Sequence, residues 1–168
     1  MLVSIVVLCT NKKVNELDKR LQNILKRVSF SYELIYVFRS RSIYLEHRPT
    51  MQAKFVCVKH FFRTRKQVEK VFRMTEGDYV IILSPDIMNS PFHMIDSIEL
   101  IKNNGWDMIT MLDQVVSYSF FKKCKSMIQN IVHPTRIFFT MKRKVMEDWL
   151  LKKDISHLSA YYLQLKEK

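Results

Sequence analysis

The stretch L-V-S-I-V-V-L-C at residues 2–9 decides the fold, because it is an almost unbroken run of aliphatic and β-branched residues. Such a run is typical of a strand that is buried on both faces, as in a parallel sheet. A helical pattern follows over Asn15–Val28, and Y-E-L-I-Y-V-F at residues 32–38 predicts a second strand. Strand, helix and strand in this order predict a parallel α/β unit.

The same alternation continues along the rest of the chain, without an internal repeat or a clear linker. Gly77 is expected to end the second helix and Gly105 the third, as glycine commonly does at the C-terminal end of a helix. We therefore expect a single α/β domain over residues 1–168. Further strands are predicted at residues 54–58, 79–83, 106–111 and 137–141, and further helices at 64–75, 90–104, 120–131, 142–151 and 155–165.

The composition excludes several kinds of site. Gly77 and Gly105 are the only glycines, too few for a Walker loop or a G-x-G-x-x-G fingerprint, which need glycine where the backbone approaches phosphate. The three cysteines are scattered, which predicts no disulfide framework, and no His or Cys spacing fits a zinc site. The formal net charge of +12 indicates an anionic partner, such as nucleic acid, a phosphorylated ligand or an acidic membrane.

The start of the chain shows neither a basic region nor a cleavage site of the secretory type. The apolar run at residues 2–9 is also too short to span a bilayer. We therefore expect a cytoplasmic protein, either free or held peripherally at the inner face of the membrane.

Four stretches occur in the order of known family motifs. They are V-S-I-V-V-L-C-T-N at 3–11, Y-E-L-I-Y-V-F-R-S-R-S at 32–42, E-G-D-Y-V-I-I-L-S-P-D-I at 76–87, and H-P-T-R-I-F-F-T-M-K-R-K-V-M-E at 133–147. The set resembles family-two glycosyltransferases of the GT-A fold, especially the dolichol-phosphate-mannose-synthase-like branch. The resemblance implies a GT-A-like, Rossmann-type three-layer sandwich around a central, mostly parallel sheet. It also implies transfer of a sugar from a nucleotide-sugar donor to a lipid-phosphate or glycan acceptor, as in polysaccharide biosynthesis.

The resemblance also implies which residues form the site. Asp86 matches the second carboxylate of the family's D-x-D motif, which binds the divalent metal, Mg²⁺ or Mn²⁺, that bridges the donor diphosphate. Arg39 and Arg65 are implied to contact the donor phosphates, and Asn11 the edge of the nucleotide. Asp113, on the loop after the strand at 106–111, is the only acid that we consider as a general base.

Several acidic positions of the family are replaced in this chain. Phe38 and Arg39 stand where the family carries acids after its second strand, and Ser84 stands in place of the first D-x-D carboxylate. A single carboxylate is expected to hold a divalent ion weakly before the donor binds. Cationic side chains can stabilise a departing diphosphate by the same electrostatic principle. The remaining replacements are Lys12 for a glutamate, His133 for an aspartate and Ile137 for a glycine.

These replacements leave three hypotheses open. The first is an active or weakened glycosyltransferase. The second is an inactive GT-A-like scaffold that forms a homo- or hetero-oligomer with another glycosyltransferase. The third, a nucleic-acid-binding domain, is supported by charge alone, because no RNP, KH or helix-turn-helix signature is present. Structural alternatives also exist for single residues: Asn11 as a helix cap, Asp86 as a turn residue and Arg39 as part of a solvated loop.

Overall fold

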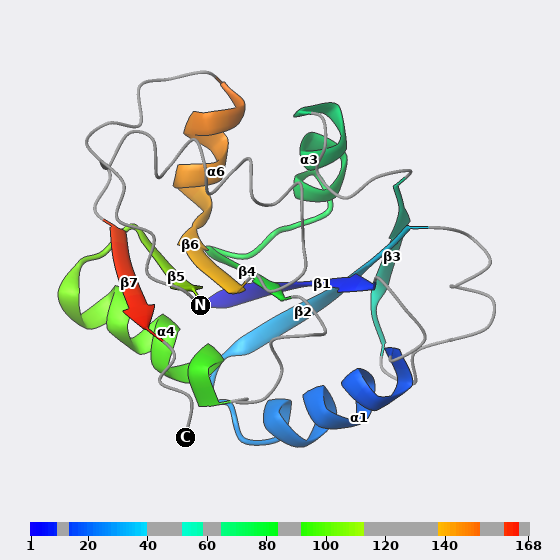
Figure 1. The fold of residues 1–168 in the computed structure, drawn as a ribbon, viewed down its shortest axis with the longest axis horizontal. Coiled ribbons are helices and arrows are strands. Elements are labelled where there is room, and N and C mark those ends of the chain that lie inside the picture. The colour runs from blue at the N-terminus through cyan, green and yellow to red at the C-terminus, as the bar shows by residue number, and fades with distance from the viewer. Residues whose placement is uncertain are drawn as a thin grey trace.

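The computed structural model describes residues 1–9, 14–39, 52–58, 65–83, 92–112, 138–151 and 160–164, whose strands form one seven-stranded sheet (Figure 1). The strand order is β3-β2-β1-β4-β6-β5-β7, and β6 runs antiparallel to both of its neighbours. The other paired strands are parallel. The strands are β1 Leu2–Cys9, β2 Ser31–Phe38, β3 Lys54–Cys57, β4 Tyr79–Leu83, β5 Met108–Leu112, β6 Phe138–Lys142 and β7 Ala160–Gln164.

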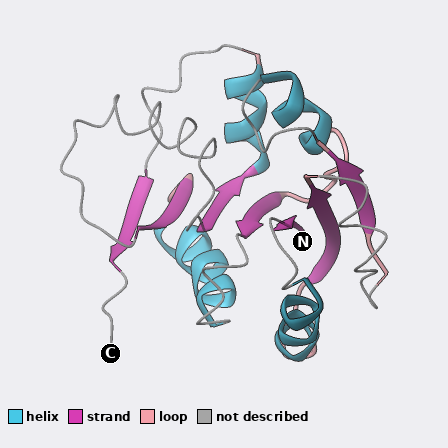
Figure 2. Ribbon diagram, turned by 45° about the vertical axis from the view of Figure 1, so that its right-hand side comes forward, coloured by secondary structure: helices cyan, strands magenta, loops and turns pink. Residues whose placement is uncertain are grey.

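Helices cover both faces of this sheet (Figures 1 and 2). On one face, Leu21 of α1 and Ile98 of α4 join the core residues Val3, Ile5 and Val7 of β1. On the other face, α3 and α6 pack against alternate residues of the same strands. The expected α/β three-layer sandwich with a mostly parallel sheet is therefore confirmed. The helices are α1 Val14–Leu25, α3 Arg65–Phe72, α4 Phe92–Asn104 and α6 Arg143–Leu150.

The unbroken apolar run of β1 has the burial that its composition predicts. Every residue from Val3 to Cys9 is buried, because the strand lies in the middle of the sheet with helices on both sides. Odd-numbered residues of β1 face α1 and α4, and Val6 and Leu8 face α3 and α6. A side chain of this kind contributes about 1.5–3 kcal/mol when it is fully buried.

One predicted helix is wrong. The pattern at residues 155–165 was expected to be helical, but Ala160–Gln164 form the strand β7, which pairs in parallel with β5. Two adjacent tyrosines favour an extended strand, and β5 offers an edge whose backbone groups β7 satisfies. A spacing of apolar residues that fits a short helix therefore did not decide the local structure, because pairing across the sheet did.

Helix ends also differ from the sequence-based bounds. The helix expected to reach Val28 ends at Leu25, and the one expected to reach Thr75 ends at Phe72. Gly105 has a φ of 70° directly after α4, so its predicted role as a helix terminator is confirmed. The helix predicted at residues 120–131 lies outside the described residues.

Gly77 does not terminate α3 but allows the segment that enters β4 to approach β1 closely. A Cβ atom on Gly77 would lie 2.5 Å from the backbone nitrogen of Ser4 and 2.9 Å from the carbonyl oxygen of Leu2. The Gly77 N–H donates a hydrogen bond of 2.8 Å to Ser4 Oγ. The prediction that Gly77 ends the helix is therefore wrong, and the residue is required because any side chain would overlap β1.

Candidate functional site at the carboxyl ends of the parallel strands

The centre of the sheet is the point where the strand order reverses. From β1 the chain passes through α1 to β2 on one side, and β4 lies on the other side of β1. The carboxyl ends of β1, β2, β3 and β4 share one edge because these strands are parallel, with Val7 opposite Leu83 and Cys9 opposite Phe38. In open α/β sheets, ligands bind at this edge, beside the switch point. We call it the carboxyl edge.

The structure describes two of the residues predicted to form the site. Arg39 directly follows β2 at the carboxyl edge and is exposed, and Arg65 is the first residue of α3. Asn11, Asp86 and Asp113 lie outside the described residues. They follow β1, β4 and β5 in the sequence, and these three strands run in one direction. The structure thus places the strand ends that precede these residues, and of the five it describes only Arg39 with its side chain.

Phe38, which stands where the family carries an acid, is part of the core. Its side chain is fully buried, and its ring centroid lies 6.3 Å from those of both Tyr36 and Phe55. Tyr36 and Phe55 stack in turn, with centroids 6.1 Å apart. Such aromatic pairs add to the free energy of burial. At the end of β2 this chain therefore presents an apolar residue inside the core and the cationic Arg39 outside it.

Asp18 is a buried carboxylate beneath this edge that the sequence analysis missed. The residue is only 2% exposed, and Tyr36 donates a hydrogen bond of 2.6 Å to its Oδ1 atom. Gln22 donates one of 3.4 Å to Oδ2. Helical spacing contained the signal, because Asp18 shares a face with the buried Leu21 and Leu25.

Cys9 and Tyr36 both lie near this carboxylate, and their pKa values reflect it. Burial, and then the negative charge of Asp18, raise the pKa of the Cys9 thiol well above its usual range. Burial, followed by the hydrogen bond to Asp18 and its charge, also raises the pKa of Tyr36. Cys9 is therefore a protonated, buried thiol.

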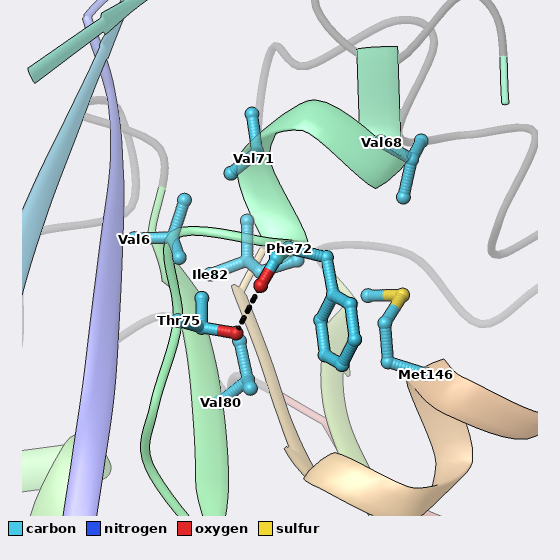
Figure 3. Close-up of a pocket in the computed structure, with 8 residues that line it drawn as sticks. All are labelled: Val6, Val68, Val71, Phe72, Thr75, Val80, Ile82 and Met146. Carbon is cyan, nitrogen blue, oxygen red and sulfur yellow. Dashed lines mark hydrogen bonds between the residues drawn. The ribbon is translucent and has the colours of Figure 1, made fainter. Parts of the chain in front are cut away.

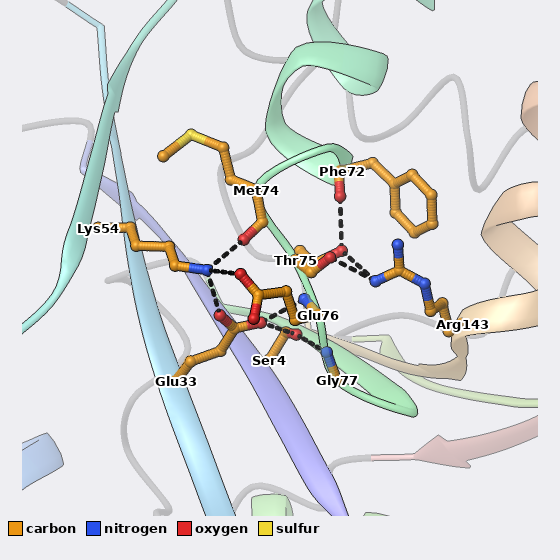
Figure 4. A network of polar contacts seen from close by, with 9 residues as sticks. All are labelled: Ser4, Glu33, Lys54, Phe72, Met74, Thr75, Glu76, Gly77 and Arg143. Atoms are coloured by element: carbon orange, nitrogen blue, oxygen red, sulfur yellow. Dashed lines mark hydrogen bonds and ion pairs between the residues drawn. The ribbon is translucent and has the colours of Figure 1, made fainter.

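The opposite edge of the sheet, where the parallel strands begin, carries a network of polar contacts (Figure 4). Lys54 Nζ donates hydrogen bonds to Glu33 Oε2 at 2.8 Å, to Glu76 Oε1 at 2.5 Å and to the Met74 carbonyl at 3.1 Å. Glu33 Oε1 accepts hydrogen bonds from Ser4 Oγ and from the Glu76 N–H, each at 2.5 Å. The network therefore joins β1, β2 and β3 to the segment that enters β4.

Arg143 extends this connection to α6. Its guanidinium donates hydrogen bonds to the carbonyl and to the hydroxyl of Thr75, and it lies 4.5 Å from the centroid of the Phe72 ring. Glu147 accepts a further hydrogen bond from Arg143 Nε at 2.9 Å. These groups use their hydrogen-bonding capacity within the fold, so we assign them a structural role.

A small cavity lies beneath α3 (Figure 3). Its volume is about 10 Å³, the lower limit for one water molecule, and apolar cavities of this kind stay dry. Thr75, its single polar side chain, donates its hydroxyl to the Phe72 carbonyl. The cavity is therefore a gap in packing rather than a ligand site. It is lined by Val6, Val68, Val71, Phe72, Thr75, Val80, Ile82 and Met146.

No group of three or more His, Cys, Asp or Glu in the described ranges lies together in a way that could hold a metal ion. In the same part of the chain, no helix has the length and apolar character needed to cross a bilayer.

Solved structures share the fold over almost the whole chain. A CMP:2-keto-3-deoxy-manno-octonic acid synthetase complexed with CTP matches with a TM-score of 0.58 and 9% identity, over 98% of this chain and 91% of the synthetase. Glucosyl-3-phosphoglycerate synthase from Mycobacterium tuberculosis, with Mn²⁺, UDP and phosphoglyceric acid, matches with a TM-score of 0.62 and 14% identity, over 96% and 68%.

A mannosyltransferase from Pyrobaculum calidifontis, in complex with GDP-mannose and Mn²⁺, matches with a TM-score of 0.59 and 12% identity. The match covers 96% of this chain but only 54% of the mannosyltransferase. No protein-family model matches the sequence, and a sequence search of curated proteins finds no match. At these identities the likeness shows the fold, so the chain has a GT-A-like α/β fold.

Proposed function

We propose that the chain is a glycosyltransferase domain that binds a nucleotide-sugar at the carboxyl edge and transfers its sugar to a lipid-phosphate or glycan acceptor. The observation that carries this proposal is the meeting of the carboxyl ends of β1 and β4 at the switch point of the sheet. Solved proteins of similar fold are found in complex with CTP, UDP and GDP-mannose. The motif residues Asn11 and Asp86 follow these two strand ends in the sequence, after Cys9 and Leu83 respectively.

Each predicted site residue has a role in this proposal. Arg39 and Arg65 bind the donor phosphates, because a guanidinium matches the geometry of phosphate oxygens. Asn11 contacts the edge of the nucleotide, and Asp86 holds Mg²⁺ or Mn²⁺ together with the diphosphate. Such an ion would stabilise the negative charge of the leaving nucleotide. Asp113 accepts the proton of an acceptor hydroxyl, whereas a phosphate acceptor is already ionised and needs no base.

The second candidate is a GT-A-like domain that has lost catalysis and acts as a scaffold for another glycosyltransferase. The complete burial of Phe38 favours it, because no carboxylate is available there to bind a nucleotide. In either case we propose a cytoplasmic location, at the inner face of the membrane if the acceptor is a lipid phosphate. The net charge of +12 would then favour the acidic membrane surface, at about 1 kcal/mol per cation close to it.

A nucleotide screen tests donor binding. We expect UDP, GDP or one of their sugar conjugates to raise the melting temperature in the presence of Mn²⁺. A ligand at one hundred times its Kd stabilises the fold by about 2.7 kcal/mol, which for a chain of this size raises Tm by roughly 5–10 °C. Thermal unfolding with each nucleotide, with Mn²⁺ or with EDTA, provides the measurement. If no nucleotide changes Tm under either condition, the donor site does not exist.

Replacement of Arg39 tests its contact with phosphate. We expect Arg39→Ala to weaken nucleotide binding about tenfold, which is 1.4 kcal/mol, because one charged hydrogen bond to phosphate is lost. Because Arg39 is exposed, its replacement should leave Tm unchanged. Arg27→Ala is the matched control, since Arg27 is also exposed but lies between α1 and the start of β2, at the opposite edge. Equal affinities of both variants in calorimetric titration would remove Arg39 from the site.

Replacement of Asp86 tests the metal and separates the two candidate functions. In an active transferase, Asp86→Asn should abolish the dependence of nucleotide binding on Mn²⁺ and lower turnover, because the carboxylate no longer contributes its charge. Binding that keeps its full Mn²⁺ dependence in this variant would exclude Asp86 as a ligand. Nucleotide binding by the unmodified chain, without sugar transfer to any lipid-phosphate or glycan acceptor, would favour the scaffold.

A further inference from the structure

The Asp18 carboxylate is buried at a cost in free energy. Removal of a charged group from water is unfavourable unless hydrogen bonds offset it, and an apolar residue on the buried face of α1 would avoid that cost. Asp18 is nevertheless almost completely buried, and its Oδ1 atom accepts the hydroxyl of Tyr36, which is itself fully buried. The contact joins residues 18 positions apart in the sequence, from a helix to a strand.

This contact lies where the donor site is proposed. Asp18 is close to the start of α1, the helix that the chain enters after the connection from β1, and the charge of Asp18 acts on Cys9 at the end of β1. Tyr36 is two residues before the end of β2, and its ring stacks on Phe38, the neighbour of Arg39. One hydrogen bond therefore links the beginning of α1 to the carboxyl end of β2.

We propose that Asp18 and Tyr36 are a positioning pair, which holds the beginning of α1 against the end of β2. The inference rests on the proposed function, because Asn11 precedes that helix in the sequence and Arg39 follows that strand. Neither member of the pair touches the ligand. The pair sets the distance between the end of β1, after which Asn11 contacts the nucleotide, and the end of β2, after which Arg39 binds the phosphates. Supporting residues play this role in preorganised sites.

A second buried hydroxyl contact provides the matched control. Ser97 Oγ of α4 lies 2.7 Å from Thr140 Oγ1 of β6, and both residues are completely buried. This contact also joins a helix to a strand on the same face of the sheet as α1. It involves neither β1, β2 nor α1. A purely structural role predicts that loss of either contact lowers stability and changes the site equally.

The first test is nucleotide affinity, with UDP and GDP in the presence of Mn²⁺ as probes. We expect Tyr36→Phe to raise Kd about tenfold and Ser97→Ala to leave it within about twofold, at a temperature at which all variants are folded. Asp18→Asn as a single change keeps an oxygen that can accept a hydrogen bond from the Tyr36 hydroxyl, so this variant should keep most of the affinity that Tyr36→Phe loses. Equal weakening in Tyr36→Phe and Ser97→Ala, or no weakening in either, would overturn the inference.

The second test needs no ligand and separates this inference from the proposed function. Amide hydrogen exchange over residues 9–18 should be at least about fivefold faster in Tyr36→Phe than in the unmodified chain, because the local opening equilibrium shifts when the contact is lost. Ser97→Ala should show no change over the same residues. If the unmodified chain binds no nucleotide, the proposed function fails while this local difference supports the pair. Unchanged exchange in Tyr36→Phe overturns it.

Discussion

Gly77→Ala is expected to lower the free energy of unfolding by about 3 kcal/mol or more, the largest effect of a single methyl group that we predict for this chain. The added Cβ would lie 2.5 Å from the Ser4 nitrogen and 2.7 Å from Ser4 Oγ. Two of the three closest atoms belong to the backbone of β1, so they cannot move away as the end of a flexible side chain could. Displacement of Ser4 would also disturb its hydrogen bond to Glu33.

Gly105→Ala is the control for this variant. In the described part of the chain, no atom lies within 4 Å of a Cβ atom built on Gly105, but the φ of 70° at this residue is one that alanine rarely adopts. We expect a cost of about 1 kcal/mol, which comes from backbone conformation alone. Urea denaturation of both variants, with their midpoints compared at equal slope, measures the difference. If Gly77→Ala is no less stable than Gly105→Ala, the close approach of Gly77 to β1 is not tight.

Glu33→Gln is expected to destabilise the protein by about 2 kcal/mol at neutral pH. The Glu33 side chain is only 14% exposed and pairs with Lys54 at 2.8 Å. The replacement removes the charge opposite Lys54 and adds an NH₂ group where Glu33 accepts hydrogen bonds from Ser4, Lys54 and the Glu76 backbone. Glu147→Gln is the control, because the Glu147 carboxylate is more exposed than that of Glu33 and its partner Arg143 lies in the same helix. Such a pair contributes at most about 0.5 kcal/mol.

The same carboxylate predicts a dependence of stability on pH. Burial by itself raises the pKa of Glu33. Hydrogen bonds from Lys54, Ser4 and the Glu76 backbone together lower it by more than burial raises it, so the net pKa lies below its usual value. A lowered pKa in the folded state stabilises the protein fully above the usual pKa of glutamate, and this stabilisation is lost as the pH falls through the lowered value. Denaturation midpoints from pH 7 to pH 3 should therefore fall less steeply in Glu33→Gln. Parallel curves for the two proteins would contradict this assignment.

Much of the fold could be predicted from local patterns. The apolar runs at residues 2–9 and 79–83 identify the central strands, because only a strand between two layers of helices buries consecutive side chains. Gly105 after two asparagines identifies the end of α4. The apolar spacing at residues 155–165 misled, because a short strand and a short helix share such patterns, and the open edge of β5 decided between them.

The candidate site was predictable only in part, for a different reason. Resemblance to family motifs predicted that Arg39 contacts the donor phosphates; the structure places Arg39 at the carboxyl edge, and its role there stays a prediction. The sequence did not indicate that Asp18 is buried, since a charged residue followed by Lys19 and Arg20 is typical of a solvent-facing helical surface. The Tyr36 hydroxyl, from another element, makes burial of this carboxylate tolerable.

The amino-acid sequence by itself determined the class of the fold, the central strands and the basic character of the chain, because these depend on composition and on the spacing of neighbouring residues. Only the tertiary structure decided that Gly77 faces β1, that Glu33 pairs with Lys54, and that residues 160–164 extend the sheet. The physical reason is that each of these depends on a contact between segments far apart in the chain. Such a contact changes the free energy of unfolding only when folding has brought the two segments together.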